Sequence, residues 1–147
     1  DRILEAEETG AIAISLYALG LSELPPEIGN LTNLQSLSVI NNNLTSLPPE
    51  IANLTALHRL DLYGNNLSKL PPEIGVLNNL RELGLYGNNL TSLPPEISNL
   101  SNLEFLNLSG NEFHIFPQEI VSLSNLQWLF LSHNQLSNLA VHYCCCK

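Results

Sequence analysis

The chain has 147 residues, and a hydrophobic content of 44% is typical of one folded domain rather than of a disordered segment. Five basic residues against 14 acidic ones leave a formal net charge of −9, and the basic residues form no cluster, which argues against a nucleic-acid partner. No apolar run is long enough to cross a bilayer, the first residues lack the pattern of a secretion signal, and the 3 cysteines are too close together to join distant parts of the fold.

Residues 1–10 predict a short helix at the start of the chain. Ile3, Leu4 and Ala6 are apolar within an otherwise acidic stretch, and Gly10 stands where a helix would end. A first strand is expected at residues 12–16. We interpret residues 1–10 as an N-terminal helical cap, because the first unit of a repeated fold exposes apolar side chains unless another segment covers them.

Residues 11–139 repeat with a strict period of 23 residues. The pattern LYGNNLSKLPPEI at residues 62–74 returns as LYGNNLTSLPPEI at residues 85–97. The same register places a leucine or phenylalanine at Leu24, Leu47, Leu70, Leu93, Phe116 and Leu139, and an asparagine at Asn42, Asn65, Asn88, Asn111 and Asn134. The period defines five full repeats and a partial sixth.

Each unit predicts a short strand, a turn and a helical segment. Leu60 and Leu62 are separated by one residue, which is the period of a strand that points its leucines to one side. Asn65 then supplies a side chain that can hydrogen-bond the backbone of a turn. The prolines of the segment PPEIGVL, residues 71–77, cannot join a sheet but suit the first turn of a helix. Because one strand cannot bury its own leucines, the units must stack with their strands parallel.

The unit LxxLxLxxNxLxxLPxEIxxLxx resembles the leucine-rich repeat family over about nine tenths of the chain. The resemblance implies an α/β solenoid, a curved right-handed horseshoe arc with a parallel β-sheet on its concave face and short helical turns on its convex face. The LPxEI unit is similar to the repeats of bacterial leucine-rich repeat domains, including those associated with Roc-COR GTPases, and of plant intracellular Ras-group proteins. A phosphate-binding loop of the GTPase type is absent from this sequence.

The sixth unit is incomplete, because residues 140–147 read AVHYCCCK where other units continue with PPEI or PQEI. We expect these residues to form an irregular C-terminal tail. Three adjacent cysteines lack the spacing that lets a chain wrap a metal ion, and the final lysine does not fit a prenylation signal. No cap is predicted over Leu126, Leu129 and Leu131, so this end is a fragment boundary, a poorly ordered tail or a site of end-to-end self-association.

The sequence contains no recognisable motif for catalysis, metal binding or cofactor binding. Asp61 follows His58 closely, but nothing marks a nucleophile or an oxyanion hole beside them. A glutamate that recurs in each of the five full units is interpreted as a residue at the positive end of the helical segment: Glu27, Glu50, Glu73, Glu96 and Glu119. We therefore predict that the protein is not an enzyme and uses no cofactor.

The outward-facing residues of the predicted strands vary where the leucines do not, and they are the candidate partner-binding residues. They combine aromatic side chains, which are typical interface anchors, with a polar centre. The set consists of Tyr17, Ile40, Arg59, Asp61, Tyr63, Glu82, Tyr86, Phe105, Asn107, Trp128 and Phe130. The alternative is that neighbouring aromatic side chains only stack on one another along the sheet.

These observations predict a non-enzymatic module that binds a partner protein through the concave face. The resemblance to intracellular family members implies a cytoplasmic recognition domain in signalling or scaffolding. An extracellular or surface-exposed domain that recognises a host protein or a glycan is the first alternative. However, plant receptor ectodomains of this family typically have a 24-residue unit with a Gly-x-Ile-Pro signature. In this chain LPxEI recurs every 23 residues, which favours the intracellular type. A structural spacer with no saturable partner is the second alternative.

Overall fold

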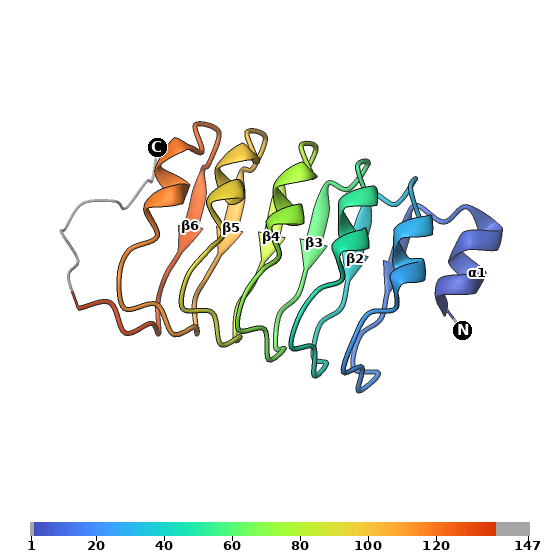
Figure 1. Cartoon of the computed structure of the whole chain (residues 1–147), viewed down its shortest axis with the longest axis horizontal. Coiled ribbons are helices and arrows are strands. Elements are labelled where there is room, and N and C mark those ends of the chain that lie inside the picture. The colour runs from blue at the N-terminus through green and yellow to red at the C-terminus, as the bar shows by residue number, and fades with distance from the viewer. Residues whose placement is uncertain (1, 138–147) are drawn as a thin grey trace.

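The structure is a computed structural model that describes residues 2–137. Six short strands lie side by side in chain order, and each neighbouring pair is parallel (Figure 1). They are β1 (Ala13–Ser15), β2 (Ser36–Ser38), β3 (Arg59–Asp61), β4 (Glu82–Gly84), β5 (Phe105–Asn107) and β6 (Trp128–Phe130). The sheet is open, and it confirms the predicted solenoid, although β1 is shorter than the strand expected at residues 12–16.

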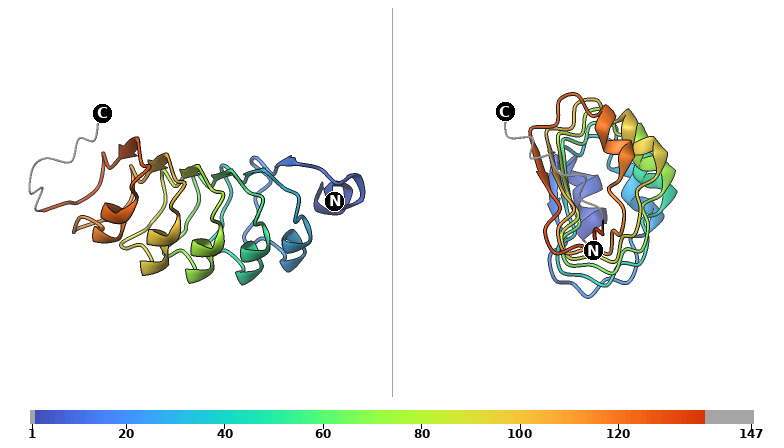
Figure 2. Two further views of the ribbon diagram at one scale, coloured as in Figure 1. Left: turned by 90° about the horizontal axis from the view of Figure 1, so that it is seen from above. Right: turned by 90° about the vertical axis from the view of Figure 1, so that its left-hand side faces the viewer.

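A short 3-10 helix follows each of the first five strands. These helices are η1 (Pro26–Asn30), η2 (Pro49–Asn53), η3 (Pro72–Val76), η4 (Pro95–Asn99) and η5 (Gln118–Ser122). Proline stands just before each helix with an extended backbone, and in η1 to η4 a second proline opens the helix. The predicted helical turns are therefore 3-10 turns, and Figure 2 shows them along one side of the stack with the strands along the other.

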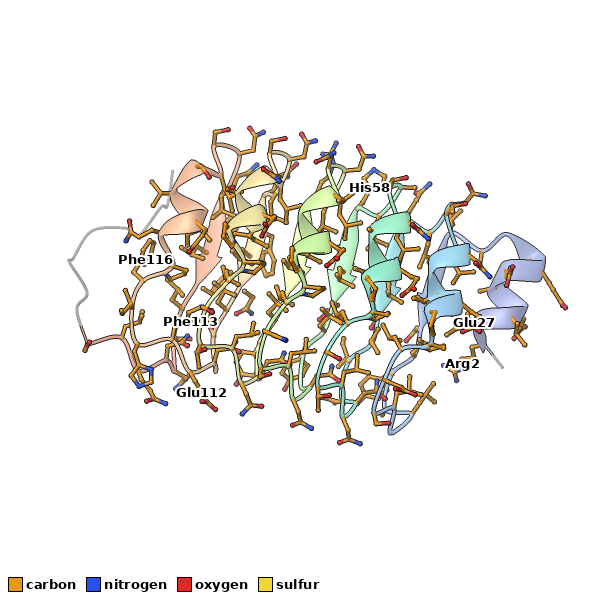
Figure 3. All side chains as sticks on the ribbon, viewed as in Figure 1. Arg2, Glu27, His58, Glu112, Phe113 and Phe116 are labelled. Carbon is orange, nitrogen blue, oxygen red and sulfur yellow. The ribbon has the colours of Figure 1, made fainter. Side chains whose placement is uncertain are left out.

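The predicted leucine core fills the space between strands and helices. Leu37, Leu60, Leu83 and Leu106 at the strand centres are fully buried, as are the isoleucines of η1 to η4. Figure 3 shows Phe113 directed into this interior and Glu112 at the outer edge. Because these side chains contact equivalent residues of the units before and after, each unit is stabilised mainly by its neighbours.

The recurring asparagine forms the predicted hydrogen-bonded ladder inside the turns. Asn65 Oδ1 accepts the backbone N–H of Leu44 at 3.0 Å, and its Nδ2 donates to the carbonyls of Val39 at 2.9 Å and Leu62 at 3.0 Å. Equivalent bonds are made by Asn42, Asn88, Asn111 and Asn134. One side chain per unit thus connects two consecutive turns and satisfies their buried backbone groups.

A second asparagine ladder, which the sequence analysis did not identify, lies just before the strands. Asn79 Nδ2 donates to the carbonyl of Thr55 at 2.8 Å, Asn102 to that of Asn78 at 2.7 Å, and Asn125 to that of Ser101 at 2.7 Å. Ala56 occupies the same position one unit earlier, so the ladder lacks a rung there.

Helix α1 (Arg2–Thr9) lies against the first unit. Its Ile3 and Ala6 side chains are buried in the common core, and Arg2 Nη1 donates to the carbonyl of Ser15 at 2.6 Å. Gly10 follows the helix with a φ of +62°. In the described part of the chain, no helix is both long enough and apolar enough to traverse a bilayer.

At the other end of the stack, Leu126, Leu129 and Leu131 are only half-buried. The predicted tail at residues 140–147, with its cysteines, lies outside the described residues, as do the last two residues of the predicted repeat region.

Candidate functional site

The predicted partner-binding residues all lie on one surface, which we call the strand face. It is formed by the first and third residues of β1 to β6 and by the residue two positions after each strand, of which Ser109 is buried. Strand register aligns these side chains in three columns that run across the units. The columns are Ala13, Ser36, Arg59, Glu82, Phe105 and Trp128; Ser15, Ser38, Asp61, Gly84, Asn107 and Phe130; and Tyr17, Ile40, Tyr63, Tyr86, Ser109 and Ser132.

The third column is held in register by backbone hydrogen bonds that continue beyond the strands. Gly64 N–H donates to the carbonyl of Tyr86 at 2.9 Å, and Asn41 N–H donates to that of Tyr63 at 2.8 Å. The residue after each member of this column has a positive φ, which suits glycine in three units and is also adopted by Ala18, Asn41 and His133. The side chains of this column are therefore presented on a regular, hydrogen-bonded backbone.

Two neighbouring tyrosines form a ridge on this face. The Tyr63 and Tyr86 ring centroids are 4.9 Å apart with an interplanar angle of 49°, so the two rings contact each other along the sheet. Stacking does not bury them, because Tyr63 remains 39% exposed and Tyr86 38% exposed. Both rings can therefore contact each other and a partner.

A second aromatic pair lies diagonally across the last two strands. Phe105 and Phe130 have ring centroids 5.5 Å apart. Strand register instead places Phe105 opposite Trp128, which is 55% exposed. Aromatic side chains reach diagonal neighbours as well as direct ones, so register alone does not determine which rings touch.

The polar centre contains one ion pair and one separate carboxylate. Arg59 Nη2 lies 2.8 Å from Oε1 and 2.7 Å from Oε2 of Glu82. The hydrogen bond and the charge of Glu82 raise the pKa of the Arg59 guanidinium above its usual value, and the charge of Asp61 contributes in the same direction to a smaller extent. Asp61 Oδ1 accepts the backbone N–H of Tyr63 at 3.2 Å. The ion pair is exposed, so it orients side chains more than it stabilises the fold.

A depression lies at the middle of the strand face, where Gly84 has no side chain in the second column. Its volume is about 350 Å³, and it is lined by Asp61, Tyr63, Gly84, Tyr86, Phe105 and Asn107. All of these residues except Gly84 belong to the predicted partner-binding set. The position of Gly84 within a strand could have indicated the depression, because glycine is unfavourable in strands and often marks a place where another group approaches the backbone closely.

The remaining predicted residues lie around this depression rather than in it. Arg59 and Glu82 are in the first column, while Ile40 and the exposed Tyr17 lie toward β1. Trp128 and Phe130 are on β6 at the opposite end. Asn41 Nδ2 donates to the hydroxyl of Tyr17 at 3.3 Å, which links Tyr17 to the next unit.

Two other kinds of site were considered in the sequence, a His58–Asp61 pair and a metal site. His58 is exposed near the edge of the molecule (Figure 3), and no bond between its ring and Asp61 is found within residues 2–137. In this same part of the chain, no three histidine, cysteine, aspartate or glutamate side chains are grouped as metal ligands would be.

Comparison with known proteins identifies the repeat. One family model, a leucine-rich repeat region, matches residues 13–85, and a second, leucine rich repeat, matches residues 78–136. Neither model describes an enzyme family. The comparison with curated proteins finds no match.

Solved structures with the same fold come from bacteria and plants. A leucine-rich repeat protein of Leptospira interrogans is 42% identical with a TM-score of 0.66, over 90% of this chain and 41% of that one. The ectodomain of the Arabidopsis thaliana receptor kinase GASSHO1/SCHENGEN3, solved in complex with CASPARIAN STRIP INTEGRITY FACTOR 2, is 40% identical with a TM-score of 0.77, over 89% of this chain and 17% of that one. The Arabidopsis thaliana SOBIR1 ectodomain is 33% identical with a TM-score of 0.71, over 84% of this chain and 70% of that one. The chain thus spans less than half the length of the first two proteins.

Proposed function

The chain belongs to the leucine-rich repeat family, and from this premise we propose that it is a non-enzymatic module that binds a protein or peptide partner through its strand face. Domains of this family generally mediate protein–protein interactions. The observation that carries the proposal is the Tyr63–Tyr86 ridge, whose rings contact each other on a hydrogen-bonded backbone yet remain more than one third exposed. Tyrosines held in this way lose little conformational freedom on binding and bury a large apolar area.

The surroundings of the ridge have the composition of an interface. Aromatic side chains lie beside a mixed polar centre with Arg59, Asp61 and Glu82, whereas the core beneath is mainly leucine and isoleucine. The similarity to a plant ectodomain solved in complex with CASPARIAN STRIP INTEGRITY FACTOR 2 supports a protein or peptide ligand. A purely structural spacer would not require exposed aromatic side chains at the middle of this face.

We propose a cytoplasmic recognition domain in signalling or scaffolding as the cellular role. The 23-residue LPxEI unit supports this choice, because it resembles intracellular members of the family. The second candidate is an extracellular or surface-exposed recognition domain, and the similarity to plant receptor ectodomains favours it. The complete reading frame separates the two, since a secretion signal upstream of Asp1 would favour the second candidate.

Partner capture tests the strand-face proposal. The wild-type chain and the double variant Tyr63→Ala/Tyr86→Ala are immobilised in turn and incubated with native cell extract. The matched control is Val76→Ala, because Val76 is 47% exposed on η3, on the opposite side of the stack. We expect a saturable partner that the wild type and the control retain and the double variant loses. Equal capture by all three chains, each with an unchanged circular dichroism spectrum, would contradict the proposal.

A further inference from the structure

We propose that the depression at Gly84 binds an arginine side chain of the partner. This inference rests on the proposed function and adds to it the type of residue that the strand face recognises. Three features of the depression carry it: its shape, its aromatic walls and its charge.

The shape of the depression suits one long side chain. Gly84 forms its floor, because the units on either side have Asp61 and Asn107 at the equivalent position. The volume of about 350 Å³ is near the lower limit of ligand pockets, which are roughly 300–1,000 Å³. The floor cannot hold a side chain without rearrangement, since a Cβ atom on Gly84 would lie 2.8 Å from Asp61 Oδ1.

Aromatic rings line the depression on two sides. Tyr63 and Tyr86 come from the third column, and Phe105 comes from the first. A cation is attracted to the face of an aromatic ring within about 6 Å, and arginine, whose planar group also stacks on rings, makes this contact more often than lysine. An apolar ligand side chain would use the same rings but would supply no positive charge to the carboxylate of Asp61.

Asp61 supplies the negative charge. Within residues 2–137 no basic side chain forms an ion pair with Asp61, because Arg59 is bound to both carboxylate oxygens of Glu82. Asp61 Oδ1 accepts one backbone N–H, from Tyr63, which fixes the carboxylate beside the depression. The cluster of Arg59, Asp61 and Glu82 has one positive and two negative charges, and the whole chain has a net charge of −9. A guanidinium group in the depression would therefore lie beside a carboxylate of opposite charge, which can accept its N–H donors.

The test compares two peptides that differ in charge and hardly in shape. A blocked pentapeptide with a central arginine, flanked by glycine and alanine, is titrated into the ¹⁵N-labelled full chain. A second titration uses the same peptide with citrulline in place of the arginine. Amide signals of Gly84, Tyr86 and Asn107 report on the depression. We expect the arginine peptide to shift these signals with an affinity at least tenfold higher than that of the citrulline peptide.

Two variants assign the preference to the depression. Asp61→Asn keeps an acceptor for the Tyr63 N–H but removes the charge, and it should make the two peptides bind equally. Gly84→Asn places a side chain on the floor and displaces the Asp61 carboxylate, which the new Cβ would approach to 2.8 Å, so it should abolish the shifts. The control Glu73→Gln removes one negative charge on η3, on the other side of the stack, and should change nothing.

The outcomes separate this inference from the proposed function. Equal binding of both peptides to the wild type, or arginine preference that survives Asp61→Asn, would overturn the arginine site but leave strand-face binding intact. The absence of shifts with either peptide would also overturn it. Failure of the Tyr63→Ala/Tyr86→Ala capture test would instead count against the binding function itself.

Discussion

Replacement of Asn88 by alanine tests how far each unit depends on its neighbours. Asn88 is 5% exposed and makes three hydrogen bonds to backbone groups of two consecutive units. Its Oδ1 accepts the Leu67 N–H at 3.0 Å, and its Nδ2 donates to the carbonyls of Leu62 at 3.0 Å and Leu85 at 3.1 Å. The substitution removes all three bonds but leaves the strands and the leucine core in place.

The three lost bonds do not cost the same. The Leu62 carbonyl also accepts from Asn65 and the Leu85 carbonyl also accepts from Asn111, so both keep a partner. The Leu67 N–H is different, since no other side chain in the described part of the chain bonds to it. A buried donor left without a partner costs about 1–3 kcal/mol, and each lost bond to a satisfied carbonyl contributes about 0.5 kcal/mol. We therefore expect Asn88→Ala to lower the free energy of unfolding by about 2–4 kcal/mol.

Urea unfolding monitored by circular dichroism measures this loss by linear extrapolation. The control is Asn89→Ala, because Asn89 is exposed and its side chain bonds the exposed carboxylate of Glu112 at 2.9 Å. Exposed substitutions of this kind change stability by less than about 0.5 kcal/mol. A loss for Asn88→Ala that is no larger than that of the control would refute the reasoning, because the ladder would then contribute nothing to unit stacking.

Three further predictions concern positions where one unit departs from the others. Ala18 has a φ of 52° where the third, fourth and fifth units have glycine, so Ala18→Gly should raise the free energy of unfolding by about 0.5–1 kcal/mol, seen as a higher urea midpoint. Ala56→Asn should extend the outer asparagine ladder by donating a hydrogen bond to the Thr32 carbonyl, and it should raise the free energy of unfolding by up to about 1 kcal/mol. An unchanged melting temperature would show that this ladder does not contribute to stability. Gly75→Ala should destabilise by about 1–3 kcal/mol, because its Cβ would collide with the Glu96 backbone carbonyl, and an unchanged urea midpoint would contradict this packing.

The backbone arrangement was predictable because the same physical requirements recur in every unit. The alternation of Leu60 and Leu62 predicted a strand, and the placement of Asn65 predicted a turn ladder, and both are present. A strict period also aligns equivalent residues of successive strands, so the three columns of the strand face follow from the sequence alone.

The details of the site were less predictable, because they depend on contacts that repeat spacing does not specify. The diagonal contact between Phe105 and Phe130 depends on side-chain rotamers rather than on register. The depression depends on an absent side chain at Gly84, and a search for aromatic and charged residues does not detect an absence. The outer ladder of Asn79 was missed because Ala56 interrupts it in the second unit.

Site-specific photo-crosslinking tests most directly the claim that the strand face is the binding surface. p-Benzoylphenylalanine is placed in one chain at Asn107, beside the depression, and in a second chain at Val76, on η3 of the opposite side. After irradiation in native extract, we expect a partner adduct from the position of Asn107 that excess unlabelled wild-type chain competes away, and none from the position of Val76. A competable adduct from the position of Val76 alone would contradict this account.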